Sequence, residues 1–173
     1  MAVVQALWHK SYRQMVDWVA LEVGLVQALG FPVQDGQPQT ISQGHYWERR
    51  QALGLIPFFF FFFGLVAQLI RLGVISGQAL IVDSTRLQAW YHHDPGAAWV
   101  KYGRQRALLG YKVHTVLCQV SQLPLFVWVT PANVHDTLVG RVILRVTAWL
   151  YRLTVTVVYA DAAYFDRRFF EVV

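Results

Sequence analysis

The chain has 173 residues, of which 55% are hydrophobic, 15 are basic and 10 are acidic, so its formal net charge is +5. This apolar content excludes an intrinsically disordered chain and allows one domain, or a small domain plus part of a second. The positive charge favours an anionic partner, either nucleic acid or an anionic membrane. The single cysteine, Cys118, excludes an internal disulfide and a cysteine-rich zinc site.

Residues 1–76 predict a helical region. Apolar residues recur at three- and four-residue steps over 11–29, which indicates an amphipathic helix. A loop rich in Gln, Pro and Gly follows, and Thr40 or Ser42 is expected to cap the next helix. A further helix is expected over 57–72, where Pro57 suits the first turn.

The stretch from Leu53 to Ile70 (LGLIPFFFFFFGLVAQLI) raises the question of a membrane span. It has 18 residues without a charge, near the lower limit for a spanning helix. Pro57, Gly64 and Gln68 interrupt it, and arginines at both ends give no orientation. We interpret it as a buried helix of a folded domain and keep a membrane-associated protein, anchored by this stretch, as an alternative.

Residues 77–173 predict an α/β unit. Its expected elements are strands over 79–82, 110–120, 125–129 and 154–160, an amphipathic helix over 136–151, and a short helix from about 165. The order is strand, long connection, two hairpin strands, helix, strand, helix. Because a helix that joins two strands favours a parallel crossover, this order predicts a mixed sheet with helices packed on it.

Two aspartates directly follow apolar strands in this unit. Asp83 follows ALIV and Asp161 follows VTVVYA. If the two strands are parallel neighbours, both carboxylates meet at one edge of the sheet, where ligands of open α/β sheets bind. Mg²⁺ is usually held by one or two carboxylates plus waters and substrate phosphates, so the pair suits phosphodiester cleavage. The alternative is that each aspartate only ends a strand or caps a helix.

Four motifs in this half resemble the DDE domain of bacterial insertion-sequence transposases. The strings that carry the resemblance are LIVDSTRLQAWYHHDPGAAW, GYKVHTVLCQVSQLPLFVWVTPANVHDT and VVYADAAYF. They contain the family's V-D-S-T, G-Y-K-x-H, T-P-A-N-x-H-D and A-D-A-x-Y motifs, in order and at compatible spacing. The residues before them, including SYRQMVDW and RLGVISGQALIVDST, resemble the helical region that precedes this domain, which implies that residues 1–76 bind DNA.

The resemblance implies an RNase H-like fold in which Asp83 and Asp161 are the first two acids of a catalytic triad. It implies Mg²⁺ or Mn²⁺ as the cofactor, and DNA, at transposon ends and at the target, as the substrate. The third acid of the family is a Glu in a Tyr-Arg-Glu context, whereas Glu171 is too close to Asp161 and lacks that context. We therefore expect these 173 residues to be inactive alone, and expect self-association or the remainder of a transposase as a further partner. A non-catalytic DNA-binding remnant or regulator is the alternative.

Basic and aromatic residues are interleaved between the two aspartates. The aromatic residues are Trp90, Tyr91, Trp99 and Tyr102, and the basic residues are Arg86, Lys101, Arg104, Arg106 and Lys112. This combination suits single-stranded or distorted DNA, so we predict DNA contacts from these five basic residues. A solvated surface loop is the alternative, and a cytoplasmic, nucleoid-associated location is expected.

Other polar residues have weaker interpretations. Lys112 and His114 share a strand face, so one of them could contact phosphate, although packing is as good an explanation. Asp136 is expected to cap a helix rather than to bind metal. A metal cluster at His92-His93-Asp94 is less favoured than a polar loop, and the arginines at 141, 145 and 152 indicate a solvated helix face.

Overall fold

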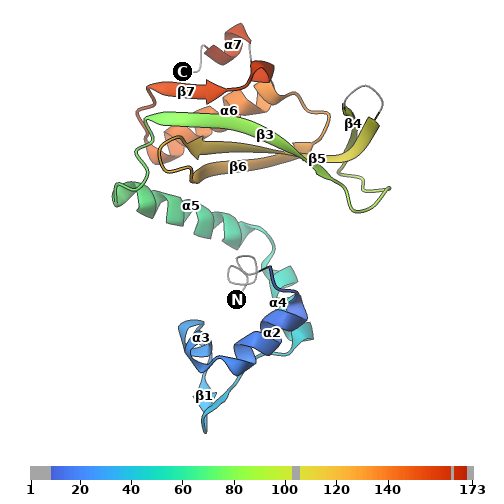
Figure 1. Ribbon diagram of the computed structural model, residues 1–173, viewed down its shortest axis with the longest axis vertical. Helices are drawn as coiled ribbons and strands as arrows, with labels where there is room; N and C mark the ends of the chain where they lie inside the picture. The colour runs from blue at the N-terminus through green and yellow to red at the C-terminus, as the bar shows by residue number, and fades with distance from the viewer. Residues whose placement is uncertain (1–8, 103–105, 165, 171–173) are drawn as a thin grey trace. The chain divides into compact units, whose positions relative to one another are not determined.

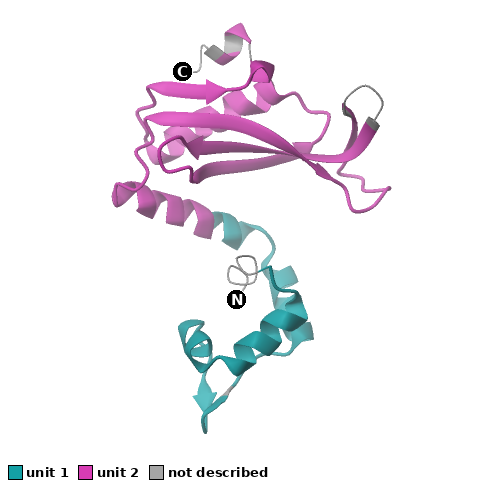
Figure 2. Ribbon diagram, viewed as in Figure 1, with its two compact units in different colours: residues 1–60 teal, residues 61–173 magenta. Residues whose placement is uncertain are grey.

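The computed structural model describes residues 9–102, 106–164 and 166–170. The chain divides into two compact units, with Phe60 ending the first and Phe61 beginning the second (Figure 2). This division lies within a helix, and the boundary predicted near Ser76-Gly77 stays a prediction. Each unit is described by itself.

The first unit is mainly helical. Its elements are α2 (Tyr12–Leu21), α3 (Val23–Ala28), the two-residue strands β1 (Val33–Gln34) and β2 (Gln37–Pro38), and α4 (Gln43–Leu53). Ser11 begins α2 with a capping box, because its side chain accepts a hydrogen bond from the Gln14 amide while the Gln14 side chain accepts one from the Ser11 amide. The predicted cap at Ser42 is confirmed, since its hydroxyl oxygen accepts from the amide of His45.

The single helix expected over 11–29 is broken at Glu22. The backbone there has φ −111° and ψ 89°, outside the helical region. The break lets α3 turn, and Val26 then joins Met15 and Val19 of α2 in one buried cluster with Tyr46 of α4. Burial in this small core therefore overrides the continuous helical pattern of the sequence.

Helix α5 (Ile56–Arg71) contains the phenylalanine run. Gly54, with φ +62°, separates it from α4, and Gly73, with φ +73°, follows its end. Among the described residues, no single helix has the length and apolar content to cross a membrane. The pair α4 and α5 has both, but its two members are bent by 76° at the break.

The second unit is a mixed sheet with helices packed on it (Figure 1). Its described elements are β3 (Ala79–Gln88), β4 (Ala98–Tyr102), β5 (Arg106–Cys118), β6 (Pro124–Pro131), α6 (Asp136–Tyr151), β7 (Val157–Ala160), the 3₁₀ helix η1 (Ala162–Tyr164) and α7 (Arg167–Phe170). The bounds of α6 are those predicted from its apolar periodicity, and the predicted α/β class is confirmed.

Strand β5 is the centre of the antiparallel part of this sheet. It pairs with β3 along one side, and with β4 and then β6 along the other. Strand β7 pairs with β3 in parallel, as the helical crossover through α6 predicts. The segment expected to be a long connection is instead mostly strand, because β3 and β5 continue their ladder outward and β4 adds to it. The described order is thus β-β-β-β-α-β-α, with one strand more than predicted.

One apolar core holds this unit together. It combines side chains of β3, β5, β6 and α6 with the second half of α5, including Leu80, Val116, Leu125, Ile143 and Val66, all at most 2% exposed. The phenylalanine run contributes to it through Phe63, whose ring stacks on that of Phe126 with centroids 5.5 Å apart. The apolar run that forms β7 suggests a buried strand, but Val157 and Tyr159 are about half exposed, because they lie on the opposite face of the sheet from Val158, which packs on the core.

Candidate metal and DNA site

The two predicted metal ligands lie at the ends of neighbouring parallel strand segments. The β3–β7 register pairs Val82 with Ala160, and the next residues along the chain are Asp83 and Asp161. Both aspartates are exposed. Asp83 remains in β3, where it pairs with Thr115 of β5, whereas Asp161 leaves β7 and leads into η1.

Each carboxylate is oriented by a local hydrogen bond. The Asp83 Oδ1 atom accepts from the amide of Ser84 at 2.7 Å, and the Asp161 Oδ1 atom accepts from the amide of Ala163 at 2.9 Å. The second bond starts η1, so Asp161 also acts as a cap. Among the described residues, neither carboxylate has a further hydrogen bond or ion pair that would occupy its other oxygen.

Tyr164 is a buried side chain close enough to both aspartates for their charges to affect its pKa. Its side chain is 2% exposed. Burial raises the pKa of its hydroxyl above the ordinary value, and the negative charges of Asp136, Asp83 and Asp161 raise it further, against a lowering contribution from Ser84. Three aspartates therefore lie within electrostatic range of one phenol.

The residue types suit a hard divalent cation. Mg²⁺ and Mn²⁺ prefer carboxylate oxygens and tolerate sites in which water and substrate complete the coordination. Asp83 and Asp161 offer two such groups, exposed to solvent and at aligned strand positions. No group of three or more His, Cys, Asp or Glu side chains in the described part of the chain forms a metal cluster, which includes the segment around His92 and His93.

Beside Asp83 lies a polar cluster that we call the Asp136 network. Its members are Ser84, Lys112, His114, Thr130 and Asp136. The Ser84 hydroxyl donates to Asp136 Oδ1 at 2.8 Å, and Lys112 Nζ lies 3.0 Å from the same oxygen. His114 Nδ1 is 3.7 Å from that oxygen, while its Nε2 shares a 2.9 Å hydrogen bond with Thr130 Oγ1. The network thereby ties β3, β5 and β6 to the first turn of α6.

The interior of the sheet sets the protonation of this network. Burial lowers the pKa of His114, and Lys112 lowers it further, although Asp136 opposes the shift. Burial opposes ionisation of Asp136, but the hydrogen bonds from Lys112 and Ser84 outweigh it, so the pKa of Asp136 is lowered. The two shifts favour a charged Asp136 carboxylate beside a neutral His114 imidazole.

This arrangement changes the interpretation of two predicted residues. Lys112 was predicted to contact DNA, yet it is 6% exposed, pairs with Asp136 and donates to the carbonyl of Val134 at 2.7 Å. Its ammonium is directed to internal acceptors rather than to a phosphate. Asp136 was expected to be a helix cap, but the side chain of the N-cap residue, His135, makes no capping bond, and Asp136 joins the network instead. The residues of the network are present in the G-Y-K-x-H and H-D motifs, but their contacts depend on the strand register, which the sequence alone does not give.

Two of the other predicted DNA contacts, Arg86 and Lys101, lie on strands of the sheet. Arg86 of β3 and Lys101 of β4 are exposed. Arg104 and the side chain of Arg106 lie outside the described residues. A hollow of about 400 Å³ lies beside these strands, and its lining includes Trp90, Tyr91 and Trp99, which are 90%, 70% and 61% exposed.

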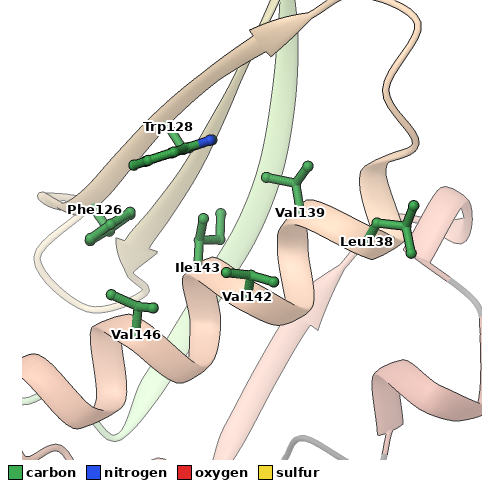
Figure 3. Close-up of a pocket in the computed structure, with 7 residues that line it drawn as sticks. All are labelled: Phe126, Trp128, Leu138, Val139, Val142, Ile143 and Val146. Atoms are coloured by element: carbon green, nitrogen blue, oxygen red, sulfur yellow. The ribbon is translucent and has the colours of Figure 1, made fainter.

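A second cavity lies between β6 and α6 and is apolar. Its volume is about 390 Å³. Its lining, drawn in Figure 3, consists of Phe126, Trp128, Leu138, Val139, Val142, Ile143 and Val146. None of these side chains carries a charge or an oxygen, so this cavity does not suit a metal or a phosphate.

Comparison with protein families identifies the second unit. The family described as "Transposase DDE domain" matches residues 76–173, more than half of the chain. Searches of curated proteins and of solved structures returned no match. The matched range contains both candidate metal ligands and the whole Asp136 network, and the predicted RNase H-like α/β class is confirmed. The chain therefore belongs to the transposase family that carries a DDE domain.

Proposed function

We propose that Asp83 and Asp161 together bind Mg²⁺ or Mn²⁺, and that the domain acts in cleavage and transfer of DNA strands during transposition. The observation that carries the proposal is the parallel β3–β7 register, which brings the two acids to the same level of the sheet. When bound, the ion would supply Lewis-acid activation of a phosphodiester. The two carboxylates hold it and remain open to solvent and substrate.

Contacts to the DNA backbone would come from the outer strands. Arg86 and Lys101 are exposed on β3 and β4, in a stretch from 84 to 110 whose only acid is Asp94. Phosphate neutralisation by such residues gives affinity independent of sequence. The exposed rings of Trp90 and Trp99 offer stacking faces for unpaired bases. Arg104 and Arg106 belong to the same proposal on their sequence position.

These 173 residues carry two of the three acids that the resemblance implies, so we propose that they do not perform strand transfer alone. The third acid would come from the remainder of a transposase or from an assembled partner. We propose that the protein acts in the cytoplasm, in association with the nucleoid.

The metal proposal is tested by titrating the chain with Mn²⁺ and following the electron paramagnetic resonance signal of the free ion. We expect saturable binding that Asp83→Asn or Asp161→Asn weakens by roughly 10-fold or more. Asp94→Asn is the matched control, because Asp94 accepts from the Gly96 amide in a separate loop. Equal binding by wild type and both variants would refute a metal site at these aspartates.

A non-catalytic DNA-binding role is the second candidate, favoured by the exposed basic and aromatic residues of the outer strands. Fluorescence anisotropy with labelled single- and double-stranded oligonucleotides, at several salt concentrations and without metal, tests it. Lys101→Ala should weaken binding and reduce the salt slope by about one. Arg145→Ala, on the exposed face of α6, serves as a charge-matched control. DNA binding without metal-dependent cleavage, even when the remainder of a transposase supplies the third acid, would favour this second role.

A further inference from the structure

We propose that helix α6 positions both candidate metal ligands, Asp83 through the Ser84–Asp136 hydrogen bond and Asp161 through the packing of Tyr164 on Gly140. The inference rests on the proposed function, because it treats the two aspartates as ligands. It adds residues that do not touch the metal but determine whether two carboxylates on separate strands meet. Such supporting contacts commonly govern metal affinity.

The first connection runs from α6 to β3. Asp136 lies in the first turn of α6, and its Oδ1 accepts the Ser84 hydroxyl at 2.8 Å across 52 residues of chain. Ser84 in turn uses its amide to hold Asp83 Oδ1 at 2.7 Å. The side chain and the amide of one serine therefore link the helix to the ligand, and a shift of Ser84 changes the direction of the Asp83 carboxylate.

Asp136 is itself firmly held. Lys112 lies 3.0 Å away and is 6% exposed, and its Nζ also donates to the carbonyl of Val134 just before α6. A buried ion pair with several hydrogen bonds has few alternative geometries, which makes it a suitable anchor for a neighbouring group. The ion pair therefore fixes the position of the carboxylate oxygen to which the Ser84 hydroxyl donates.

The second connection runs from α6 to the segment after β7. Tyr164 ends η1, three residues after Asp161, and is 2% exposed. A Cβ atom added at Gly140 of α6 would lie 2.5 Å from Cε1 of Tyr164, so only glycine lets the ring approach this closely. The amide of Tyr164 also donates to the Asp161 carbonyl at 3.1 Å. Seating the ring on α6 therefore fixes the short turn that carries Asp161.

The alternative is that Asp136 binds the metal directly. The two roles respond differently to asparagine. Asp136→Asn keeps an oxygen that can accept from both the Ser84 hydroxyl and Lys112, at some cost in stability, but removes the carboxylate charge that a ligand needs. Asp136→Ala removes both.

The test measures Mn²⁺ affinity by the same resonance titration, with urea unfolding to establish that every variant is folded. Asp136→Ala should weaken Mn²⁺ binding by roughly 10-fold or more, whereas Asp136→Asn should weaken it much less. Ser84→Ala should reproduce part of the loss, and Ser84→Ala combined with Asp136→Ala should lose no more than Asp136→Ala alone. Thr147→Ala, a buried change about three turns beyond Asp136 in α6, should reduce stability without altering Mn²⁺ affinity.

The Tyr164 connection has its own matched pair. Gly140→Ala should weaken Mn²⁺ binding several-fold by displacing the ring. Tyr164→Phe should weaken the affinity much less than Gly140→Ala, because the ring is retained and only the buried hydroxyl near Ser84 is lost.

The outcomes separate this inference from the function on which it rests. Wild-type affinity in both Asp136→Ala and Gly140→Ala, with affinity lost in Asp83→Asn, would overturn the positioning role alone. An equal loss in Asp136→Asn and Asp136→Ala would overturn it in favour of Asp136 as a ligand. Binding that is indifferent to Asp83→Asn and Asp161→Asn would overturn both proposals together.

Discussion

Lys112 Nζ lies 3.0 Å from Asp136 Oδ1, and the two side chains are only 7% and 16% exposed. This pair joins β5 to α6 inside the sheet–helix interface. Because both partners are largely removed from water, loss of either charge leaves the other without compensation, which is costly for a buried pair.

Acidification should destabilise the second unit through Asp136. Its pKa in the folded chain is below the ordinary value of 3.8, so its contribution to folding is complete above 3.8 and is lost as the pH falls through the folded pKa. Urea unfolding between pH 6 and pH 2.5 should show this loss. Asp136→Asn should have a lower stability at pH 6 and a shallower decline in acid, and an unchanged acid decline would contradict the assignment.

His114 should add a second loss of stability, at a pH closer to neutral. Burial and Lys112 lower the pKa of His114 below 6.5 despite the opposing charge of Asp136. The unfolded chain therefore takes up the proton first, and stability is complete above 6.5 and declines as the pH falls toward the folded pKa. His114→Gln, which keeps a side chain able to bond Thr130, should remove the decline between pH 6.5 and pH 5. Thermal unfolding at these two pH values measures it.

Two glycines should respond oppositely to alanine. A Cβ atom at Gly110 would overlap the carbonyl oxygen of Leu87 on the paired strand, so Gly110→Ala should destabilise the sheet by about 1–3 kcal/mol. Gly64 lies within α5 and has no atom within 4 Å of an added Cβ, so Gly64→Ala should stabilise by about 1 kcal/mol through helix propensity. Urea unfolding of both variants compares them, and the same sign of change for both would be inconsistent with this packing.

The phenylalanine run should stabilise the second unit through Phe63, which stacks on Phe126, more than through its exposed members. Phe126, 6% exposed, stacks on Phe63, so Phe126→Ala should cost about 3–5 kcal/mol of unfolding free energy. Phe60→Ala, at a ring of the run that is 74% exposed, is the control and should cost much less. A double-mutant cycle of Phe63 and Phe126 should give a coupling of about 0.5–1.5 kcal/mol. Additive losses would show that the stacking contributes nothing specific.

Long amphipathic and apolar segments could be predicted from the sequence, because their periodicity is local. The bounds of α6 and the strands before Asp83 and Asp161 are examples. Strand β4 was missed because its residues, AWVKY, follow a polar, glycine-containing stretch and become a strand only by pairing with β5. The break at Glu22 was missed because it serves the burial of Val26.

The candidate metal ligands could be predicted from the ends of apolar runs together with the family motifs. The Asp136 network could not, since it depends on the register of three strands against a helix. Lys112 was assigned to DNA because it ends a basic stretch that is interleaved with aromatic residues. Its burial follows from a partner 24 residues later in the chain, and no local pattern indicates that partner.

Strand β3 changes character at Asp83. Up to Val82 it is flanked on both sides, by β5 and β7, whereas from Asp83 to Gln88 β5 is its one neighbour among the described strands. Amide hydrogen exchange should therefore divide this single strand, with slow exchange requiring global opening near Leu80 and faster exchange by local fraying near Leu87. Asp83 lies at this division: the doubly paired segment before it and the Ser84–Asp136 hydrogen bond after it hold its backbone, so we expect motion of β3 to be confined to the residues beyond Ser84.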